Sequence, residues 1–127
     1  MYNMSLAQSG YATAGKEARV MNAGPHELIT IMFEELINLL DEIYVIYART
    51  EKQGIADQQA MALTIVDSLM ISLDMEKGGD LSKNLHQLYG QVRQLIAGRE
   101  PENRMENNRA AYRIISEIFS AWSQIRN

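Results

Sequence analysis

The sequence predicts an all-α fold, an antiparallel up-down-up-down four-helix bundle that follows an N-terminal arm. Apolar residues recur at helical spacing in four segments, no segment shows sustained strand alternation, and the breaks between segments are short. The 127 residues are the length of one ordinary domain with one core. We therefore expect residues 1–24 to form the arm and residues 25–127 to form the bundle domain.

The first helix is expected in "PHELITIMFEELINLLDEIYVIYART", residues 25–50. Pro25 suits the first helical position because its missing N–H would have no partner there, and Gly24 is a tolerable N-cap. Apolar residues fill most of the circumference and leave a narrow polar stripe, formed by Glu27, Glu34, Asn38 and Asp41. We expect this helix to be packed on more than one side.

The second helix is predicted from about Gln58 to Met75, after a break in the pattern near Gly54. Its core face is expected to consist of Ala62, Ile65, Val66, Leu69 and Leu73. Asp74 and Glu76 would then lie in or near the last turn, where acids meet the negative end of the helix dipole.

Two adjacent glycines predict a helical hairpin after this segment. Gly78 is expected to take the left-handed C′ position that ends the second helix, and Gly79 to let the chain reverse. Asp80 is expected to cap the third helix.

The third and fourth helices complete the bundle. The third begins near Asp80 and carries a narrow apolar seam of Leu81, Leu85, Leu88, Val92 and Leu95. Pro101 and a left-handed Gly98 are expected to end it. The fourth begins at Glu102 or Met105 and extends to Arg126, with a core face of Ala111, Ile115, Ile118, Trp122 and Ile125.

The composition narrows the classes of function. The absence of cysteine excludes a disulfide framework and thiolate metal sites, and no stretch is long and apolar enough for a secretory signal or a membrane span. A cytoplasmic protein fits these features best. The net charge of −4 is divided unevenly, with an acidic segment from Glu27 to Asp80 and a basic one from Leu81 onward. Neither half is basic enough to indicate nucleic-acid binding.

The motifs of catalysis are missing, so we expect no enzyme activity, no metal and no cofactor. The residues three before His26 and His86 are Ala23 and Lys83, whereas a di-iron bundle needs glutamate there. No nucleotide-binding or hydrolase motif is present either. His86 lies one place beyond the predicted seam and is expected at the boundary or the surface.

The remaining apolar residues favour an interaction protein. Once the core faces are assigned, the second helix retains Met61, Leu63, Met70 and Ile71, and the fourth retains Tyr112 and Phe119. The eight methionines could fill gaps in the core or adapt to varied partners. An amphipathic or extended peptide would use such residues as anchors.

Three segments resemble the FliS family of flagellar secretion chaperones. "SLDMEKGGDLSKNLHQLYGQVRQLI", residues 72–96, is similar to the family's Ser-Leu-Asp-x-Glu-x-Gly-Gly-(Glu/Asp)-(Ile/Leu)-x-x-Asn-Leu-x-x-Leu-Tyr. "AGPHELITIMFEELI", residues 23–37, resembles its Ala-Ser-Pro-x-x-Leu helix start, and "IISEIFSAWSQI", residues 114–125, its closing helix. This chain departs from the family in having Gly24 where the helix start has serine.

The resemblance implies a cytosolic chaperone that binds the disordered C-terminal segment of flagellin. It further implies that such a protein prevents premature polymerisation and presents flagellin to the type III export apparatus. The central motif adds Asn84 and Tyr89 to the candidate contacts and assigns Gly78 and Gly79 a structural role. The candidate flagellin-binding residues are Leu63, Met70, Ile71, Asn84, Tyr89, Tyr112 and Phe119.

Several alternatives stay open at this point. Tyr2 and Tyr11 in the N-terminal arm could compete with flagellin for the bundle, as the family's arm can cover part of the client groove. The client could be another flagellar protein, such as a filament cap protein. The leftover apolar face could instead be the surface of a homodimer or of a self-associating regulatory bundle.

Overall fold

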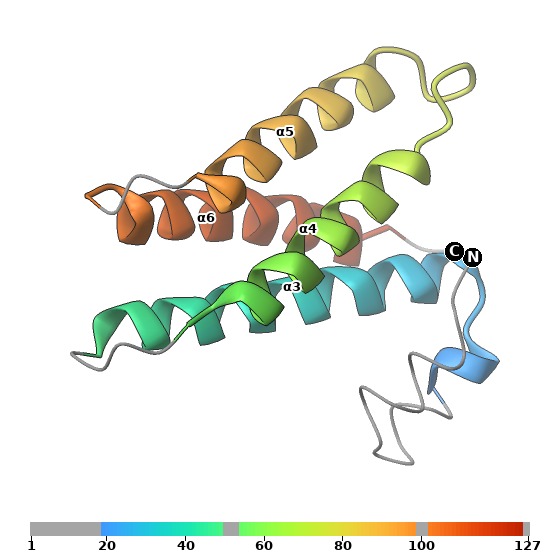
Figure 1. The fold of residues 1–127 in the computed structure, drawn as a ribbon. Coiled ribbons are helices and arrows are strands. Elements are labelled where there is room, and N and C mark those ends of the chain that lie inside the picture. The colour runs from blue at the N-terminus through green and yellow to red at the C-terminus, as the bar shows by residue number, and fades with distance from the viewer. Residues whose placement is uncertain (1–18, 50–53, 99–101, 126–127) are drawn as a thin grey trace.

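A computed structural model of the chain describes residues 19–49, 54–98 and 102–125. These residues form four long helices, α3 (Pro25–Ala48), α4 (Ala56–Ile71), α5 (Gly79–Ala97) and α6 (Arg104–Ser123), and a short helical turn at residues 19–22 precedes α3 (Figure 1). Each helix runs antiparallel to the next. α3 packs against α4 and α6, and α5 packs against the same two helices, which confirms the four-helix bundle.

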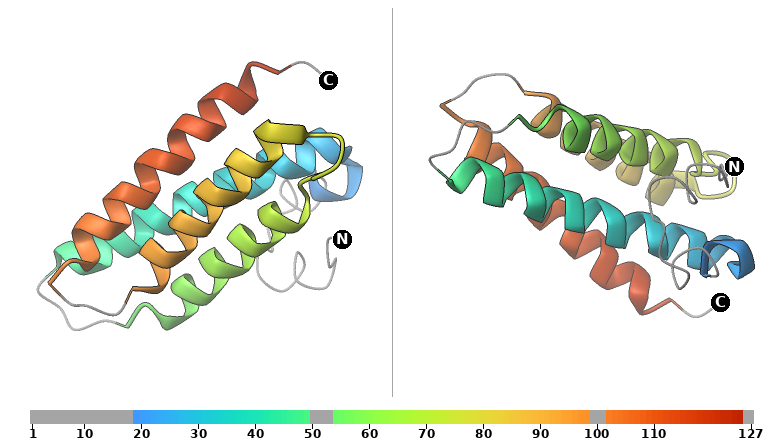
Figure 2. Two further views of the ribbon diagram at one scale, coloured as in Figure 1. Left: turned by 90° about the horizontal axis from the view of Figure 1, so that it is seen from above. Right: turned by 60° about the horizontal axis from the view of Figure 1, so that its bottom comes forward.

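The four helices lie as two pairs, α4 with α5 over α3 with α6. The pairs are close together near the α3–α4 and α5–α6 connections and diverge toward the α4–α5 turn (Figure 2). The antiparallel order brings the beginnings of α3 and α5 and the ends of α4 and α6 to this wider side, which we call the open end.

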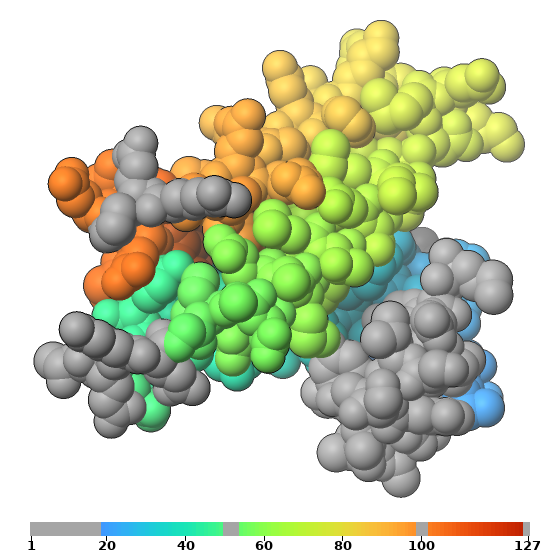
Figure 3. Space-filling view, in the orientation of Figure 1, coloured from blue at the N-terminus to red at the C-terminus, as the bar shows by residue number. Residues whose placement is uncertain are grey.

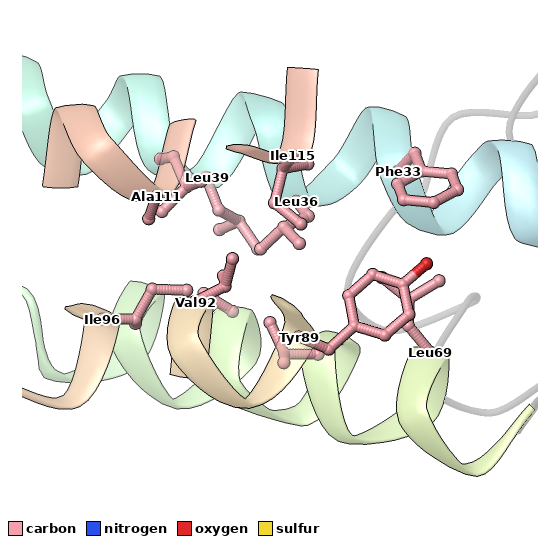
Figure 4. Close-up of a cluster of buried hydrophobic side chains, with 12 residues drawn as sticks. Phe33, Leu36, Leu39, Leu69, Tyr89, Val92, Ile96, Ala111 and Ile115 are labelled. Carbon is pink, nitrogen blue, oxygen red and sulfur yellow. The ribbon is translucent and has the colours of Figure 1, made fainter. Parts of the chain in front are cut away.

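One hydrophobic core joins the two pairs. Figure 4 shows Leu36 and Ile115 of the α3–α6 pair facing Val92 of α5, with Phe33, Leu69 and Tyr89 farther along toward the open end. The complete buried cluster consists of Phe33, Leu36, Leu39, Leu40, Ala62, Val66, Leu69, Tyr89, Val92, Ile96, Ala111 and Ile115. Burial of this apolar surface provides the main stabilisation of the fold.

The start of α3 agrees with the sequence prediction. Gly24 is the N-cap and makes no side-chain hydrogen bond, and Pro25 is the first helical residue. The predicted polar stripe binds arginines of the same chain, since Arg19 pairs with Glu27 and Glu34, and Arg109 pairs with Asp41. Helix α3 is therefore in contact on several sides, as its nearly continuous apolar surface predicts.

The α4–α5 connection differs from the prediction. Helix α4 ends at Ile71 rather than Met75, so Asp74 lies in the loop. Its carboxylate accepts hydrogen bonds from the backbone N–H groups of Glu76 and Lys77, at 3.1 and 2.9 Å. Ser82 Oγ donates to the Asp74 carbonyl at 2.9 Å. Asp74 thus organises the turn and is not an unfavourable acid at a helix end.

The roles of the two glycines are also different. Gly79 has the left-handed backbone, with φ of 56°, whereas Gly78 precedes α5 in ordinary right-handed geometry. Gly78 is needed for space, because a Cβ there would lie 2.7 Å from the Asp74 carbonyl oxygen and would overlap the Ser82 hydroxyl. Asp80 lies in the first turn of α5 and is not its N-cap.

Most of the core face of α5 is shifted by one residue from the predicted seam, although Val92 is buried as predicted and Leu85 and Leu95 pack against the core. Its buried residues are Ser82, Tyr89, Val92 and Ile96, whereas Leu81 is 67% exposed. The prediction for Leu81 was wrong because leucine spacing alone does not show which of two adjacent faces meets the neighbouring helices. Gly98 has φ of −55°, so the predicted left-handed cap is absent, and Ile125 lies beyond the end of α6, exposed.

Candidate functional site

The open end gathers partly buried apolar side chains from all four helices and from the α4–α5 connection. They pack against the core but keep some accessible surface, and they comprise Ile29, Met70, Leu73, Leu85, Phe119 and Trp122. The antiparallel topology explains why residues so far apart in the sequence lie at one end of the bundle. A surface of this kind suits an apolar segment of another protein.

The α4–α5 turn adds exposed apolar residues to the same end. Ile71, the last residue of α4, is 84% exposed, and Leu81, in the first turn of α5, is 67% exposed. Met75 lies between them in the turn and is 43% exposed. Figure 3 shows this turn projecting away from the remainder of the bundle.

Aromatic rings of α3 and α6 stack on one another at the open end. Phe33 stacks with Phe119 at 5.6 Å between ring centroids, and His26 stacks on Trp122 at 4.3 Å. Trp122 Nε1 donates to Thr30 Oγ1 at 3.0 Å, which fixes the indole against α3. His26 and Thr30 are not among the predicted site residues, although the spacing of His26 and Phe33 by two helical turns places these two residues on one face of α3.

Tyr89 is a core residue at the edge of the open end. Its side chain is 3% exposed and projects from α5 between Leu69 and Phe33 (Figure 4). Burial raises the pKa of its hydroxyl to about 12, because the charged form would lose solvation. Tyr89 therefore supports the surface from beneath and is not itself a surface contact.

The other predicted residues do not form one surface. On α4, Leu63 and Met70 lie toward α5, since Gln59 and Asp67 on the same face bond to Ile96 and Arg93 of α5. On α6, Phe119 lies toward α3, and Tyr112 lies beneath the guanidinium of Arg109. These two helices are diagonal in the bundle. Only Met70 and Phe119 of these four belong to the open end.

The remaining predicted residues lie at the surface or outside the described chain. Ile71 and Asn84 are exposed near the α4–α5 turn, and His86 is exposed as expected. Tyr2 and Tyr11 lie outside the residues that the structure describes. Over residues 19–49, 54–98 and 102–125, no group of three potential metal ligands occurs. No helix in these ranges is both long and apolar enough to cross a membrane.

A helical bundle that exposes apolar side chains at one end defines a protein-binding module. The comparisons with known proteins show which kind. The family described as "Flagellar protein FliS" matches residues 7–127, nearly the whole chain. The chain belongs to the FliS family.

Curated relatives agree with this assignment. The chain is 29% identical to the flagellar secretion chaperone FliS of Salmonella typhimurium, over 98% of this chain and 93% of the relative. It is 30% identical to FliS of Vibrio cholerae, over 91% and 85% of the two chains. It is 27% identical to the flagellar secretion chaperone FliSB of Pseudomonas aeruginosa, over 98% of each chain.

Proposed function

We propose that the protein is a cytoplasmic flagellin chaperone that binds the disordered C-terminal segment of flagellin at the open end. In this role it prevents premature polymerisation and presents flagellin to the flagellar export apparatus. The observation that carries the proposal is the gathering of partly buried apolar residues from all four helices at one end of a FliS-family bundle. Neither a nucleotide nor a metal is required for such binding.

In this proposal, the apolar side chains of the flagellin segment contact the chaperone instead of another flagellin subunit. A disordered segment loses conformational entropy when it binds, so it needs a large, partly apolar surface to offset that loss. Exposed Ile71 and Leu81 extend the open end beyond the core. An amphipathic segment could place its apolar side chains there as anchors.

The test is isothermal titration with a peptide of about 40 residues from the C-terminus of flagellin of the same organism, a length that could span the domain when extended. We expect a Kd of about 1 μM or lower and a negative heat-capacity change. The Ile71→Asp variant should lose affinity about tenfold or more, because it places a charge on the apolar surface.

The matched control is Val45→Asp. Val45 is 46% exposed near the other end of α3, so this variant adds the same charge away from the open end and should bind as the wild type does. Circular dichroism should show both variants folded. Equal loss of affinity in the two variants, or no binding by the wild type, would contradict the proposal. Sedimentation of the free proteins would show whether Ile71 instead belongs to a homodimer surface.

A further inference from the structure

The helical turn before α3 is attached to that helix by one arginine and two glutamates. Arg19 Nε donates to Glu27 Oε1, and Arg19 Nη1 donates to Glu34 Oε1, each at 2.5 Å. Glu27 and Glu34 are two turns apart on one face of α3. One guanidinium therefore joins two carboxylates, which its separately directed N–H groups allow and a lysine ammonium would do less well.

The two apolar side chains of the turn, Val20 and Met21, lie outside the hydrophobic core. Met21 is 67% exposed, and neither side chain belongs to the residues packed on the core. The connection to α3 is extended at Gly24, with φ of −77° and ψ of 179°. A Cβ at Gly24 would have no neighbour within 4 Å. The turn can therefore move about Ala23 and Gly24 without breaking core contacts.

We propose that Arg19, Glu27 and Glu34 form an ionic clasp that holds residues 19–22 on α3 in their helical turn, and that these residues unwind and leave α3 when the clasp opens. Release occurs when salt screens the ion pairs, or when a cationic segment of another protein takes the two carboxylates. The residues move about the Ala23–Gly24 linker, and the acidic face at the start of α3 becomes accessible. This device does not depend on the identity of the chaperone's client.

The charges favour a clasp that can open. The side chains of Arg19, Glu27 and Glu34 are 42%, 41% and 39% exposed, so water and ions screen their attraction. Hydrogen bonds to Glu34 and then Glu27 raise the pKa of the guanidinium, which is in keeping with a fully charged donor. Two carboxylates around one cation leave a net negative charge, which attracts a competing cation.

Cleavage by trypsin after Arg19 measures the release directly, because the protease must take the guanidinium away from both carboxylates. The rate at which the fragment beginning at Val20 appears is measured by mass spectrometry in about 20 mM and about 500 mM salt. When opening is fast relative to cleavage, this rate follows the population of the open form. We expect the high-salt rate to be about two- to fivefold greater, as for exposed ion pairs.

The Glu27→Gln/Glu34→Gln double variant should be cleaved rapidly in low salt and show no further salt effect. The matched control is Glu117→Gln, which removes an exposed carboxylate from α6 and should behave as the wild type does. A short peptide containing the Arg19 site corrects for the salt dependence of trypsin itself. Equal cleavage rates in wild type and double variant at both salt concentrations would overturn the clasp.

Hydrogen exchange provides a second measurement without protease specificity. In the Arg19→Gln variant, the Ala23 N–H, which donates to the Val20 carbonyl at 3.3 Å, should exchange about two- to fivefold faster than in the wild type at low salt. Core amides of α3 should be unchanged. Unchanged exchange at Ala23 would also contradict the proposal.

Discussion

The α3–α6 pair and the α4–α5 pair are held together by different kinds of contact. Asn108 Nδ2 and Arg109 Nη2 of α6 both donate to the Leu40 carbonyl in the middle of α3, at 3.2 and 3.1 Å. The α4–α5 pair is joined by a turn and by the exposed Arg93–Asp67 ion pair at 2.8 Å. In addition, Gln59 Nε2 of α4 donates a hydrogen bond to the Ile96 carbonyl of α5.

The difference follows from separation along the chain. Helices α4 and α5 are consecutive, so a short turn already keeps them close, and polar contacts at their surface add little. Helices α3 and α6 are the first and last of the bundle, and their register must be set by side chains. Directional hydrogen bonds in a mostly buried setting provide that register. We therefore expect α3–α6 to be the more rigid half and to be the more sensitive to substitution.

The Phe33→Ala substitution should produce the largest loss of stability. Phe33 is 1% exposed and stacks with Phe119 and Trp122, so its removal leaves a cavity between α3 and α6. We expect the free energy of unfolding to fall by about 3–5 kcal/mol, measured by urea denaturation. A loss below about 1 kcal/mol would mean that the open end closes over the cavity.

The Arg109→Met substitution should have the next largest effect on stability. The guanidinium lies 4.1 Å from the Tyr44 ring centroid and 4.4 Å from that of Tyr112, in addition to its bond to Leu40. Its loss should cost about 1–3 kcal/mol in urea denaturation. Arg113→Met, one turn along α6 at an exposed position, is the control and should change stability by less than about 0.5 kcal/mol. Equal effects would remove the distinction between the two helix pairs.

Gly79→Ala tests the α4–α5 turn. Alanine is strained at φ of 56°, so we expect a loss of about 1 kcal/mol by thermal denaturation. Gly79→Asn should lose less, because asparagine tolerates left-handed geometry. If the two variants are equally stable, the backbone at this position has relaxed and the turn is not constrained by it.

Ionisation of the Tyr89 hydroxyl should lower the stability of the protein only at high pH. Its pKa is raised to about 12 in the folded protein, above the ordinary value of about 10, because burial disfavours the phenolate. The neutral phenol is favoured in the folded state, so this stabilisation is complete below pH 10 and is lost as the pH rises to about 12. Urea denaturation between pH 8 and 12 should show a smaller decline in Tyr89→Phe. Parallel declines would contradict the assignment.

The periodicity of the sequence was sufficient to predict the helices and most of their buried faces. Ala62, Val66 and Leu69 of α4 are buried as predicted, because apolar residues at helical spacing form one stripe that faces the core. On α5, Val92 is buried as predicted but Leu81 is exposed, because contacts with the neighbouring helices, and not the leucine spacing, decide which face is buried. The predicted end of α4 was wrong because the Asp74 carboxylate accepts hydrogen bonds from backbone N–H groups of the loop.

The candidate site was less predictable than the fold. Of the residues predicted to contact flagellin, Met70 and Phe119 lie at the open end, whereas Leu63 and Tyr112 lie elsewhere in the bundle. His26, Thr30 and Trp122 form one cluster through contacts separated by 92 residues, which helical periodicity within one segment does not reveal.

The sequence by itself determined the helical class, the number of long helices, the position of the hairpin and membership of the FliS family, since each depends on local spacing or on a continuous motif. Only the tertiary structure decided which helices are neighbours, which glycine is left-handed and which apolar residues meet at the open end. These features depend on contacts between distant segments, whose energies are set by the packing of the whole bundle.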